Sequence, residues 1–229
     1  MRSILRSTAL AAILFASTSH LAHANLVING SFEDGAPQPG SGGFSTLNAG
    51  SSALSGWTID RTSIDWINGY WQAAAGTHSV DLDGNDPGAI SQVINTTIGA
   101  TYKLNFSYAG NPDHGGYVHD MLVDIRNDGD ANGIYSSSFN FDTTGKTRAD
   151  MGWTASGDIV FVAEAATTRL SFESLSVNAC CWGVAIDDVV VVQIAGPGGA
   201  DDAAVSAPAS LPLLIGALGS LAYLRRRAG

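Results

Sequence analysis

Between residues 25 and 194 the hydrophobic positions form short runs, separated by glycine, asparagine, aspartate or proline. Within two of these runs, Tyr102–Tyr108 and Leu170–Glu173, apolar and polar residues alternate strictly. A period of two is typical of a β-strand with one buried face, and no long stretch has the 3.6-residue period of a helix. The pattern predicts about ten strands, from the candidate runs Asn25–Asn29, Gly56–Asp60, Ser63–Ile67, His78–Asp83, Ala89–Ile94, Thr101–Tyr108, Val118–Arg126, Ile134–Phe141, Asp158–Ala163, Thr168–Leu175 and Val184–Ile194.

Many short strands without intervening helices predict an all-β fold in which two sheets form a sandwich. No internal repeat of fixed period is present, which argues against a propeller or a solenoid. Residues 195–206 are rich in glycine, alanine and aspartate, and are typical of a flexible linker. The predicted organisation is therefore one β-sandwich domain at 25–194, a linker at 195–206 and a separate tail at 207–229.

The N-terminus has the pattern of a secretory signal peptide. Arg2 and Arg6 precede the apolar run 9–16, and the small residues Ala22 and Ala24 flank His23. The apolar run is much shorter than the roughly 20 residues of a membrane span. We therefore expect residues 1–24 to be cleaved after Ala24, so that the exported protein begins at Asn25.

The C-terminus has the pattern of a short membrane helix. Residues 207–224 carry no charge, and Arg225, Arg226 and Arg227 follow them. Arginines at one end of an apolar segment favour a cytoplasmic position for that end. The tail is therefore expected to hold the chain in the inner membrane.

Linker, proline-containing motif, apolar helix and arginine cluster together resemble the PEP-CTERM class of bacterial sorting tails. Residues 205–214, which include Pro208 and Pro212, are similar to its Val-Pro-Leu-Pro-Ala variant and depart from it at Ser206 and Ala207. The resemblance implies cleavage near the motif by an exosortase-type enzyme, followed by release to, or attachment at, the cell surface. A plain tail anchor is the alternative.

Charge is distributed very unevenly along the chain. Five of the 11 basic side chains lie in the two ends, whereas all 21 acidic side chains lie between them, so residues 25–206 carry a net charge of −15. Binding to DNA or RNA needs a concentrated basic surface, and adhesion to an anionic membrane needs one too. Both partner classes are excluded by this balance.

An ordered set of short motifs covers nearly all of the middle region, namely Asn25–Glu33, Ser55–Ile59, Ser63–Ile67, Gly76–Gly84, Pro87–Gln92, Ala109–Pro112, Met151–Thr154 and Ala185–Val189. With these motifs in this order, the chain resembles the bacterial choice-of-anchor C family and is similar to a plant cell-wall family of extracellular domains of unknown function. The resemblance implies an exported galactose-binding-like jelly roll in polysaccharide-rich surroundings, with no established catalytic residue.

The same resemblance implies a structural calcium ion, because jelly rolls of carbohydrate-binding modules commonly hold one between the chain opening and the last strand. Glu33 matches the first position, and Asp187 or Asp188 matches the second. An acidic pair inside the apolar run 184–192 needs a cation or hydrogen bonds. The alternative is that one aspartate faces solvent while the other accepts backbone N–H groups.

A second stretch, Asp128–Gly133, has the oxygen spacing of the first half of an EF-hand loop. Position 12 of that loop is Phe139, so the bidentate glutamate is missing. An Asx-rich hairpin loop is the favoured interpretation, and Ca²⁺ binding between Asp128 and Asn132 stays open.

Five aromatic residues are candidates for stacking against sugar rings, namely Trp66, Tyr70, Trp71, Trp153 and Trp182. Tyr70 and Trp71 lie in a glycine-flanked stretch, where two adjacent large rings are difficult to bury together, so one of these two is favoured. The alternative is that all five pack in the core or at its rim.

Cys180 and Cys181 are the only thiols of an exported chain. Adjacent cysteines cannot form an ordinary long-range staple with each other. A strained vicinal disulfide, intermolecular disulfides and two reduced thiols are the open alternatives.

The function predicted from the sequence is that of a non-catalytic protein of the cell surface or extracellular matrix, associated with polysaccharide. The alternative is a secreted glycan-active enzyme, which would need two carboxylates across a groove. The spacing of the acids suggests no such pair, and no Gly-x-Ser-x-Gly, His-Glu-x-x-His or phosphate-loop motif occurs.

Overall fold

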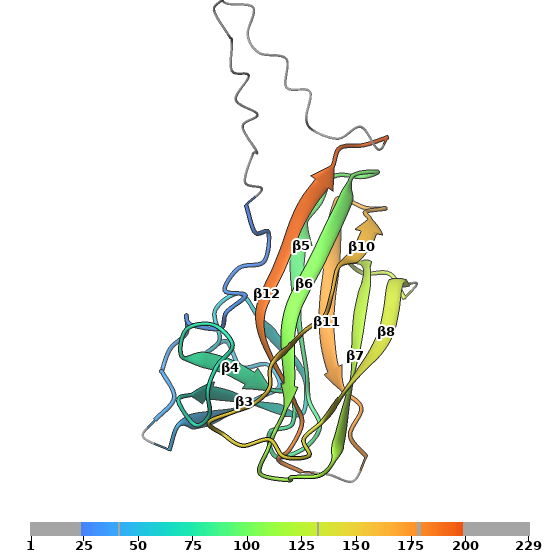
Figure 1. Cartoon of the computed structure of the whole chain (residues 1–229). Coiled ribbons are helices and arrows are strands. Elements are labelled where there is room, and N and C mark those ends of the chain that lie inside the picture. Colours follow the sequence, from blue (N-terminus) through green and yellow to red (C-terminus); the bar gives the residue numbers. More distant parts are fainter. Residues whose placement is uncertain (1–23, 41, 132, 178–179, 199–229) are drawn as a thin grey trace, which may run out of the picture.

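A computed structural model describes residues 24–40, 42–131, 133–177 and 180–198. The described part contains strands, turns and loops and no helix (Figure 1). No helix long and apolar enough to cross a membrane is therefore found in these ranges. The sorting tail and nearly all of the signal peptide lie outside the described residues.

Antiparallel pairing joins all the strands into two sheets. The first sheet has the order β1-β3-β4-β12-β6-β10, with β9 also paired to β6, and the second has the order β2-β5-β11-β7-β8. The first comprises β1 (Phe44–Asn48), β3 (Ser63–Asn68), β4 (His78–Asp81), β6 (Thr101–Gly110), β9 (Thr154–Ala155), β10 (Ile159–Val162) and β12 (Val184–Ala195). The second comprises β2 (Thr58–Arg61), β5 (Ala89–Asn95), β7 (Val118–Asn127), β8 (Gly133–Asp142) and β11 (Thr167–Ser174).

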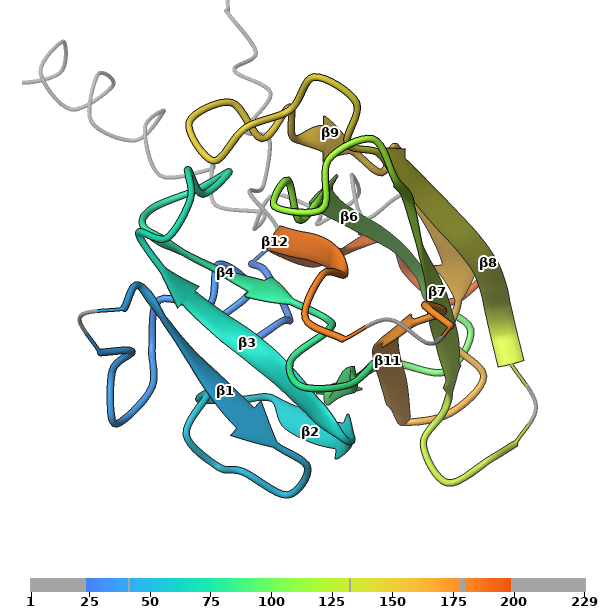
Figure 2. The same ribbon diagram turned by 90° about the horizontal axis from the view of Figure 1, so that it is seen from below.

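The two sheets pack through the alternating faces of their strands. Leu104 and Phe106 of β6 are buried, and the Phe106 ring meets the Phe172 ring of β11 edge-on at 5.1 Å between centroids. Figure 2 shows the strands of the first sheet on one side and β11, β7 and β8 on the other. The predicted jelly-roll sandwich of two sheets is confirmed.

The strand prediction fails at the opening of the domain. Residues 25–29 form no strand, although the Leu26 N–H donates to Val191 O at 2.8 Å. The Asn25 side chain takes the place of the other ladder bonds, because its Nδ2 donates to Val189 O and its Oδ1 accepts from Val191 N–H. The sequence also missed β1 and β9, which are short and polar.

Candidate functional site

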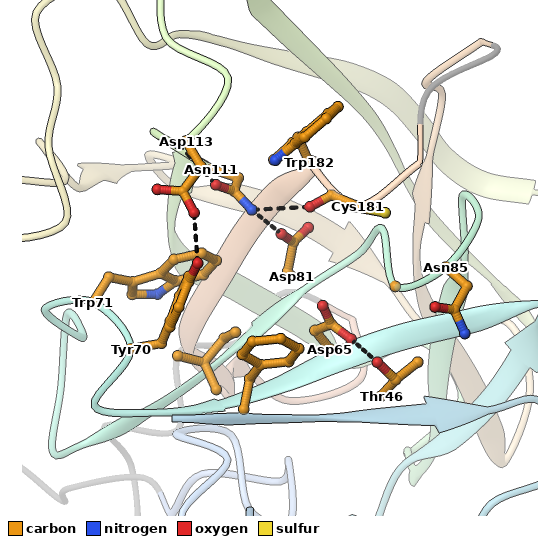
Figure 3. Close-up of a pocket in the computed structure, with 13 residues that line it drawn as sticks. Thr46, Asp65, Tyr70, Trp71, Asp81, Asn85, Asn111, Asp113, Cys181 and Trp182 are labelled. Carbon is orange, nitrogen blue, oxygen red and sulfur yellow. Dashed lines mark hydrogen bonds between the residues drawn. The ribbon is translucent and has the colours of Figure 1, made fainter. Parts of the chain in front are cut away.

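A pocket of about 230 Å³ lies beside the first sheet and draws on segments that are far apart in the sequence (Figure 3). Strands β1 and β3 supply one side, and the turn that follows β4 supplies another. The segments after β6 and before β12 complete it. Its lining residues are Phe44, Thr46, Asp65, Ile67, Tyr70, Trp71, Asp81, Gly84, Asn85, Asn111, Asp113, Cys181 and Trp182.

Buried aspartates form the polar floor of this pocket. Asp65 and Asp81 stand opposite each other in the β3–β4 ladder. Asp65 Oδ1 accepts a hydrogen bond from Thr46 Oγ1 at 2.5 Å, and Asp81 Oδ2 accepts one from Asn111 Nδ2 at 2.8 Å. Burial raises the pKa of both carboxyls, and the negative charge of Asp83 raises them further.

Asp83 is fully buried beside this floor. Neither of its oxygens receives a hydrogen bond of normal geometry. Burial raises the pKa of Asp83, and the nearby hydroxyls of Ser174 and Ser176 only partly offset the effect. The three carboxyls therefore hold protons more tightly than exposed aspartates do.

Gly183 is needed where the chain passes this floor. A Cβ atom at this position would lie 2.6 Å from Asp81 Oδ1 and 2.8 Å from Asp83 Cγ. Its N–H donates to Asp81 Oδ1 at 3.0 Å. The glycine thus allows the backbone to approach the carboxylate that it binds.

Arg148 fixes one wall of the pocket. Its guanidinium donates to both oxygens of Asp113, from Nε at 2.7 Å and from Nη2 at 2.6 Å, and its Cζ lies 3.8 Å from the centroid of the Tyr70 ring. The Tyr70 hydroxyl donates to Asp113 Oδ2 at 2.7 Å. The Arg148 contacts lower the pKa of Asp113, whereas burial raises the pKa of Asp81.

Of the five aromatic residues considered for stacking against sugars, Tyr70, Trp71 and Trp182 line the pocket, whereas Trp66 and Trp153 do not. Trp71 is almost fully buried, and its Nε1 donates to Ser79 Oγ at 2.9 Å. Trp66 needs a correction. It has no exposed surface and its Nε1 donates to Phe32 O at 2.9 Å, so its ring packs in the core and offers no face to a sugar.

No role was predicted from the sequence for Asn85 or Asn111. These residues come from loops whose meeting depends on the pairing of β4, β6 and β12. No local spacing signals that meeting, so only the three-dimensional arrangement could identify them.

Glu33 and Asp187 hold the same segment, residues 74–78, by hydrogen bonds. Glu33 accepts from the backbone N–H groups of Thr77 and His78, both at 2.8 Å, from Thr77 Oγ1 at 3.0 Å and from His78 Nδ1 at 2.7 Å. Although burial alone would raise it, bonds from His78 and Thr77 lower the pKa of Glu33 to about 2.

Asp187 is fully buried. Its Oδ2 accepts from the N–H groups of Ala74 and Ala75, both at 2.8 Å, and its Oδ1 accepts from the N–H of Asp188 at 2.6 Å. Burial raises the pKa of Asp187 to about 7, although the hydrogen bonds from these N–H groups lower it. The neighbouring Asp188 is exposed, with a φ of 50° at the bulge where β12 shifts register against β6.

These contacts do not fit a calcium ion between Glu33 and the aspartates. Four hydrogen bonds occupy the Glu33 carboxylate, which has about four lone-pair sites. Among the described residues, no three His, Cys, Asp or Glu side chains are arranged to hold a metal. In the Asp128–Asn132 loop, Asp128 Oδ1 accepts from Arg169 Nε and Nη2 at 3.1 and 2.9 Å, and Asn132 lies outside the described residues. The contacts of Glu33 and Asp187 thus oppose the calcium site expected from the sequence, and a melting experiment with EDTA tests it.

We expect EDTA to leave the melting temperature unchanged, because hydrogen bonds already satisfy the Glu33 and Asp187 carboxylates. An ion that binds only the folded state at a hundredfold excess over Kd would stabilise it by about 2.7 kcal/mol. A fall in melting temperature with EDTA that Ca²⁺ restores in the native chain but not in Glu33→Gln would therefore establish the calcium site.

Both cysteines are free thiols in the structure. Burial and a hydrogen bond with Cys180 raise the pKa of Cys181 to about 12, and Cys181 has a φ of 76°. Its carbonyl accepts a hydrogen bond from Asn111 Nδ2 at 3.1 Å. Cys181 thus contributes its backbone, rather than a reactive thiolate, to the pocket.

At mildly alkaline pH, N-ethylmaleimide is expected to modify the exposed Cys180 much faster than Cys181, because the thiolate is the reactive form. Intact-mass spectrometry of the native chain and of Cys180→Ser measures this difference. Unlabelled chain that is lighter by two hydrogen atoms would instead show a vicinal disulfide.

Comparison with known proteins places this architecture in a family. Halomucin of Haloquadratum walsbyi (strain DSM 16790 / HBSQ001) is 30% identical over 175 residues, which are 76% of this chain and 2% of that protein. The chain therefore spans only a small part of that relative.

Among solved structures, a family 4 carbohydrate-binding module superposes with a TM-score of 0.43 and 16% identity, over 73% of this chain and 99% of that chain. A family 61 module in complex with β-1,4-galactotriose superposes with a TM-score of 0.42 and 17% identity, over 74% of this chain and 99% of that chain. An arabinose-bound family 51 α-L-arabinofuranosidase superposes with a TM-score of 0.48 and 12% identity, over 75% of this chain and 27% of that chain. The family model described as "Protein of unknown function (DUF642)" matches residues 25–192, so the chain belongs to the DUF642 family.

Proposed function

We propose that the pocket binds a neutral sugar residue of an extracellular polysaccharide. Its rim combines the apolar rings of Phe44, Tyr70 and Trp182 with the exposed side-chain amide of Asn85. A sugar presents an apolar ring face and a periphery of hydroxyls, and these two kinds of group complement them. This juxtaposition of rings and hydrogen-bonding side chains is the observation that carries the proposal.

The size and charge of the pocket restrict the ligand. Its volume of about 230 Å³ lies below the roughly 300–1,000 Å³ typical of drug-sized ligands, which suits one sugar ring. Asp65, Asp81 and Asp113 line it, and Arg148 already pairs with Asp113. A uronate or sulfated sugar would meet repulsion without a free cation, so neutral sugars are favoured.

One observation favours the alternative of a glycan-active enzyme. The pocket contains two carboxyls with a raised pKa, Asp65 and Asp81, and one with a lowered pKa, Asp113. Such a separation is typical of acid and base pairs. However, both Asp113 oxygens accept from Arg148, and the Asp81 oxygens bind Asp83 N–H, Gly183 N–H and Asn111. We therefore propose binding without turnover.

Export and sorting complete the proposed function. The signal peptide and the PEP-CTERM-like tail support passage through the inner membrane, processing by an exosortase-type enzyme, and residence at the cell surface or in the matrix. Mass spectrometry of surface material should find an N-terminus at Asn25 and a C-terminus near Val205–Pro208. Recovery of the uncleaved chain from the medium would contradict export with processing.

A glycan array with the purified full chain tests the binding proposal, and a turnover assay on each hit tests the enzymatic alternative. The Asn85 side chain lines the pocket and is exposed, so Asn85→Ala should leave the fold intact. Loss of one hydrogen bond of about 0.5–1.5 kcal/mol should weaken binding roughly twofold to tenfold. The control Asn140→Ala, at an exposed position of β8, should bind like the native chain. Equal binding by all three would exclude this pocket.

A further inference from the structure

Three aromatic rings form a continuous stack that begins at the rim of the pocket. The Trp182 ring, which lines the pocket, lies 4.7 Å from the His114 ring between centroids, at an interplanar angle of 34°. His114 also stacks against Tyr117, at 3.5 Å between ring centroids and 20° between ring planes. The Tyr117 side chain remains 54% exposed. His114 thus links the ring at the pocket rim to an exposed ring.

Hydrogen bonds to one buried threonine fix the segment that carries the outer two rings. Thr143 has no exposed surface, and its Oγ1 lies 3.1 Å from His114 O and 3.0 Å from Tyr117 O. The backbone N–H of Tyr117 donates to the same Oγ1 at 3.1 Å, and the N–H of Thr143 donates to Tyr117 O at 2.9 Å. The backbone that carries these rings is therefore fixed before any ligand arrives, which lowers the entropy cost of binding.

We propose that this stack is a second sugar subsite, so that the chain recognises an oligosaccharide segment of at least two residues instead of a lone monosaccharide. The inference rests on the proposed function, because the first sugar occupies the pocket. Continuity with the pocket identifies the occupant: a sugar bound against Trp182 would direct the next residue of the same chain toward His114 and Tyr117.

The chemistry of the stack agrees with this occupant. An exposed aromatic ring beside a polar pocket offers an apolar surface of the size of one sugar ring, with a hydroxyl at its edge. In Figure 3, Trp182 lies beside Asn111 and Cys181, away from Asp65 and Thr46. A linear glycan can therefore leave the pocket over Trp182 without crossing the carboxyl groups of the floor.

The test measures affinity against ligand length by isothermal titration calorimetry with the full chain. The probes are the monosaccharide to the tetrasaccharide of the β-1,4-linked gluco, manno and galacto series. For the series that binds, affinity should rise from the monosaccharide to the longer probes. Tyr117→Ala should weaken the affinity for the longer probes about threefold to tenfold and leave the affinity for the monosaccharide unchanged.

Two further variants separate a lost subsite from a damaged fold. Tyr117→Phe keeps the ring and should keep the length dependence. Ile98→Ala removes an equally exposed apolar side chain from the turn before β6, at the opposite end of that strand from Asn111, and should change nothing.

The outcomes distinguish the two claims. Binding that Asn85→Ala weakens, but that is equal at all lengths and unaffected by Tyr117→Ala, overturns the second subsite and leaves the pocket. Absence of binding to every probe overturns the pocket and the subsite together.

Discussion

Replacement of Trp66 by alanine is expected to lower the free energy of unfolding by about 3–5 kcal/mol, the usual cost of removing a fully buried large aromatic side chain. Trp66 has no exposed surface, and its indole ring lies 5.4 Å from the His78 ring between centroids. Its truncation would also leave Phe32 O without its 2.9 Å hydrogen bond. Urea denaturation followed by circular dichroism measures the change.

Trp182→Ala is the matched control for this prediction. Trp182 is only half-buried and lies at the pocket rim, so its loss should cost about 1 kcal/mol or less of stability while it weakens glycan binding. The reverse pattern, a stable Trp66→Ala variant that has lost glycan binding, would restore Trp66 as a sugar-stacking residue and contradict the placement of its ring in the core.

The second large effect concerns pH. The melting temperature is expected to fall as the pH rises from about 5 to about 8, because the folded chain holds protons on buried carboxyls that the unfolded chain releases. Burial gives Asp187 a folded-state pKa of about 7, whereas the pKa of an aspartate exposed in the unfolded chain is 3.8. Its contribution is present below pH 3.8 and is lost as the pH rises through 7. A shift of roughly three units corresponds to at most about 4 kcal/mol.

Other titrating groups also contribute to the pH dependence of the melting temperature, at acidic and at neutral pH. Burial raises the pKa of Asp65, Asp81 and Asp83 in the same direction. Burial lowers the pKa of His119, which therefore destabilises the fold as the pH falls through about 6.5. Glu33, with a pKa of about 2, contributes stability above pH 4.5 that is lost as the pH falls through 2.

Two variants check the assignment of this pH dependence. Asp187→Asn cannot ionise, so its melting temperature should vary less between about pH 5 and pH 8 than that of the native chain. Glu33→Gln should instead lose the fall in melting temperature at acidic pH and keep the fall between about pH 5 and pH 8. A native melting temperature that rises steadily up to pH 8 would contradict the protonated state of the buried aspartates.

Alternation was sufficient to predict most strands because half of each strand faces the core. β6, for example, buries Tyr102, Leu104 and Phe106 and leaves the residues between them half-exposed. The same rule could not place Trp66, since five consecutive residues of β3 are buried. With both faces covered, the period of two no longer distinguishes the core side from the ligand side.

The candidate site was less predictable than the fold. Tyr70 and Trp71 were recognisable from their glycine-flanked position, whereas Asn85, Asn111 and Trp182 meet only because β12 pairs with both β4 and β6. The acidic pair of the last strand was recognisable as a structural feature. Its geometry, with Asp187 inside and Asp188 exposed, depends on the bulge in β12, which no local sequence signal announced.

A titration of the ¹⁵N-labelled full chain with the best glycan from the array tests the central claim most directly. The account predicts chemical-shift changes at the side-chain amides of Asn85 and Asn111 and at the indole N–H of Trp182, which line one pocket. Residues of the outer groove of the other sheet, at Arg126 and Arg169, should show no chemical-shift change. Shifts confined to that groove, with Asn85, Asn111 and Trp182 unchanged, would contradict a sugar-binding role for the pocket.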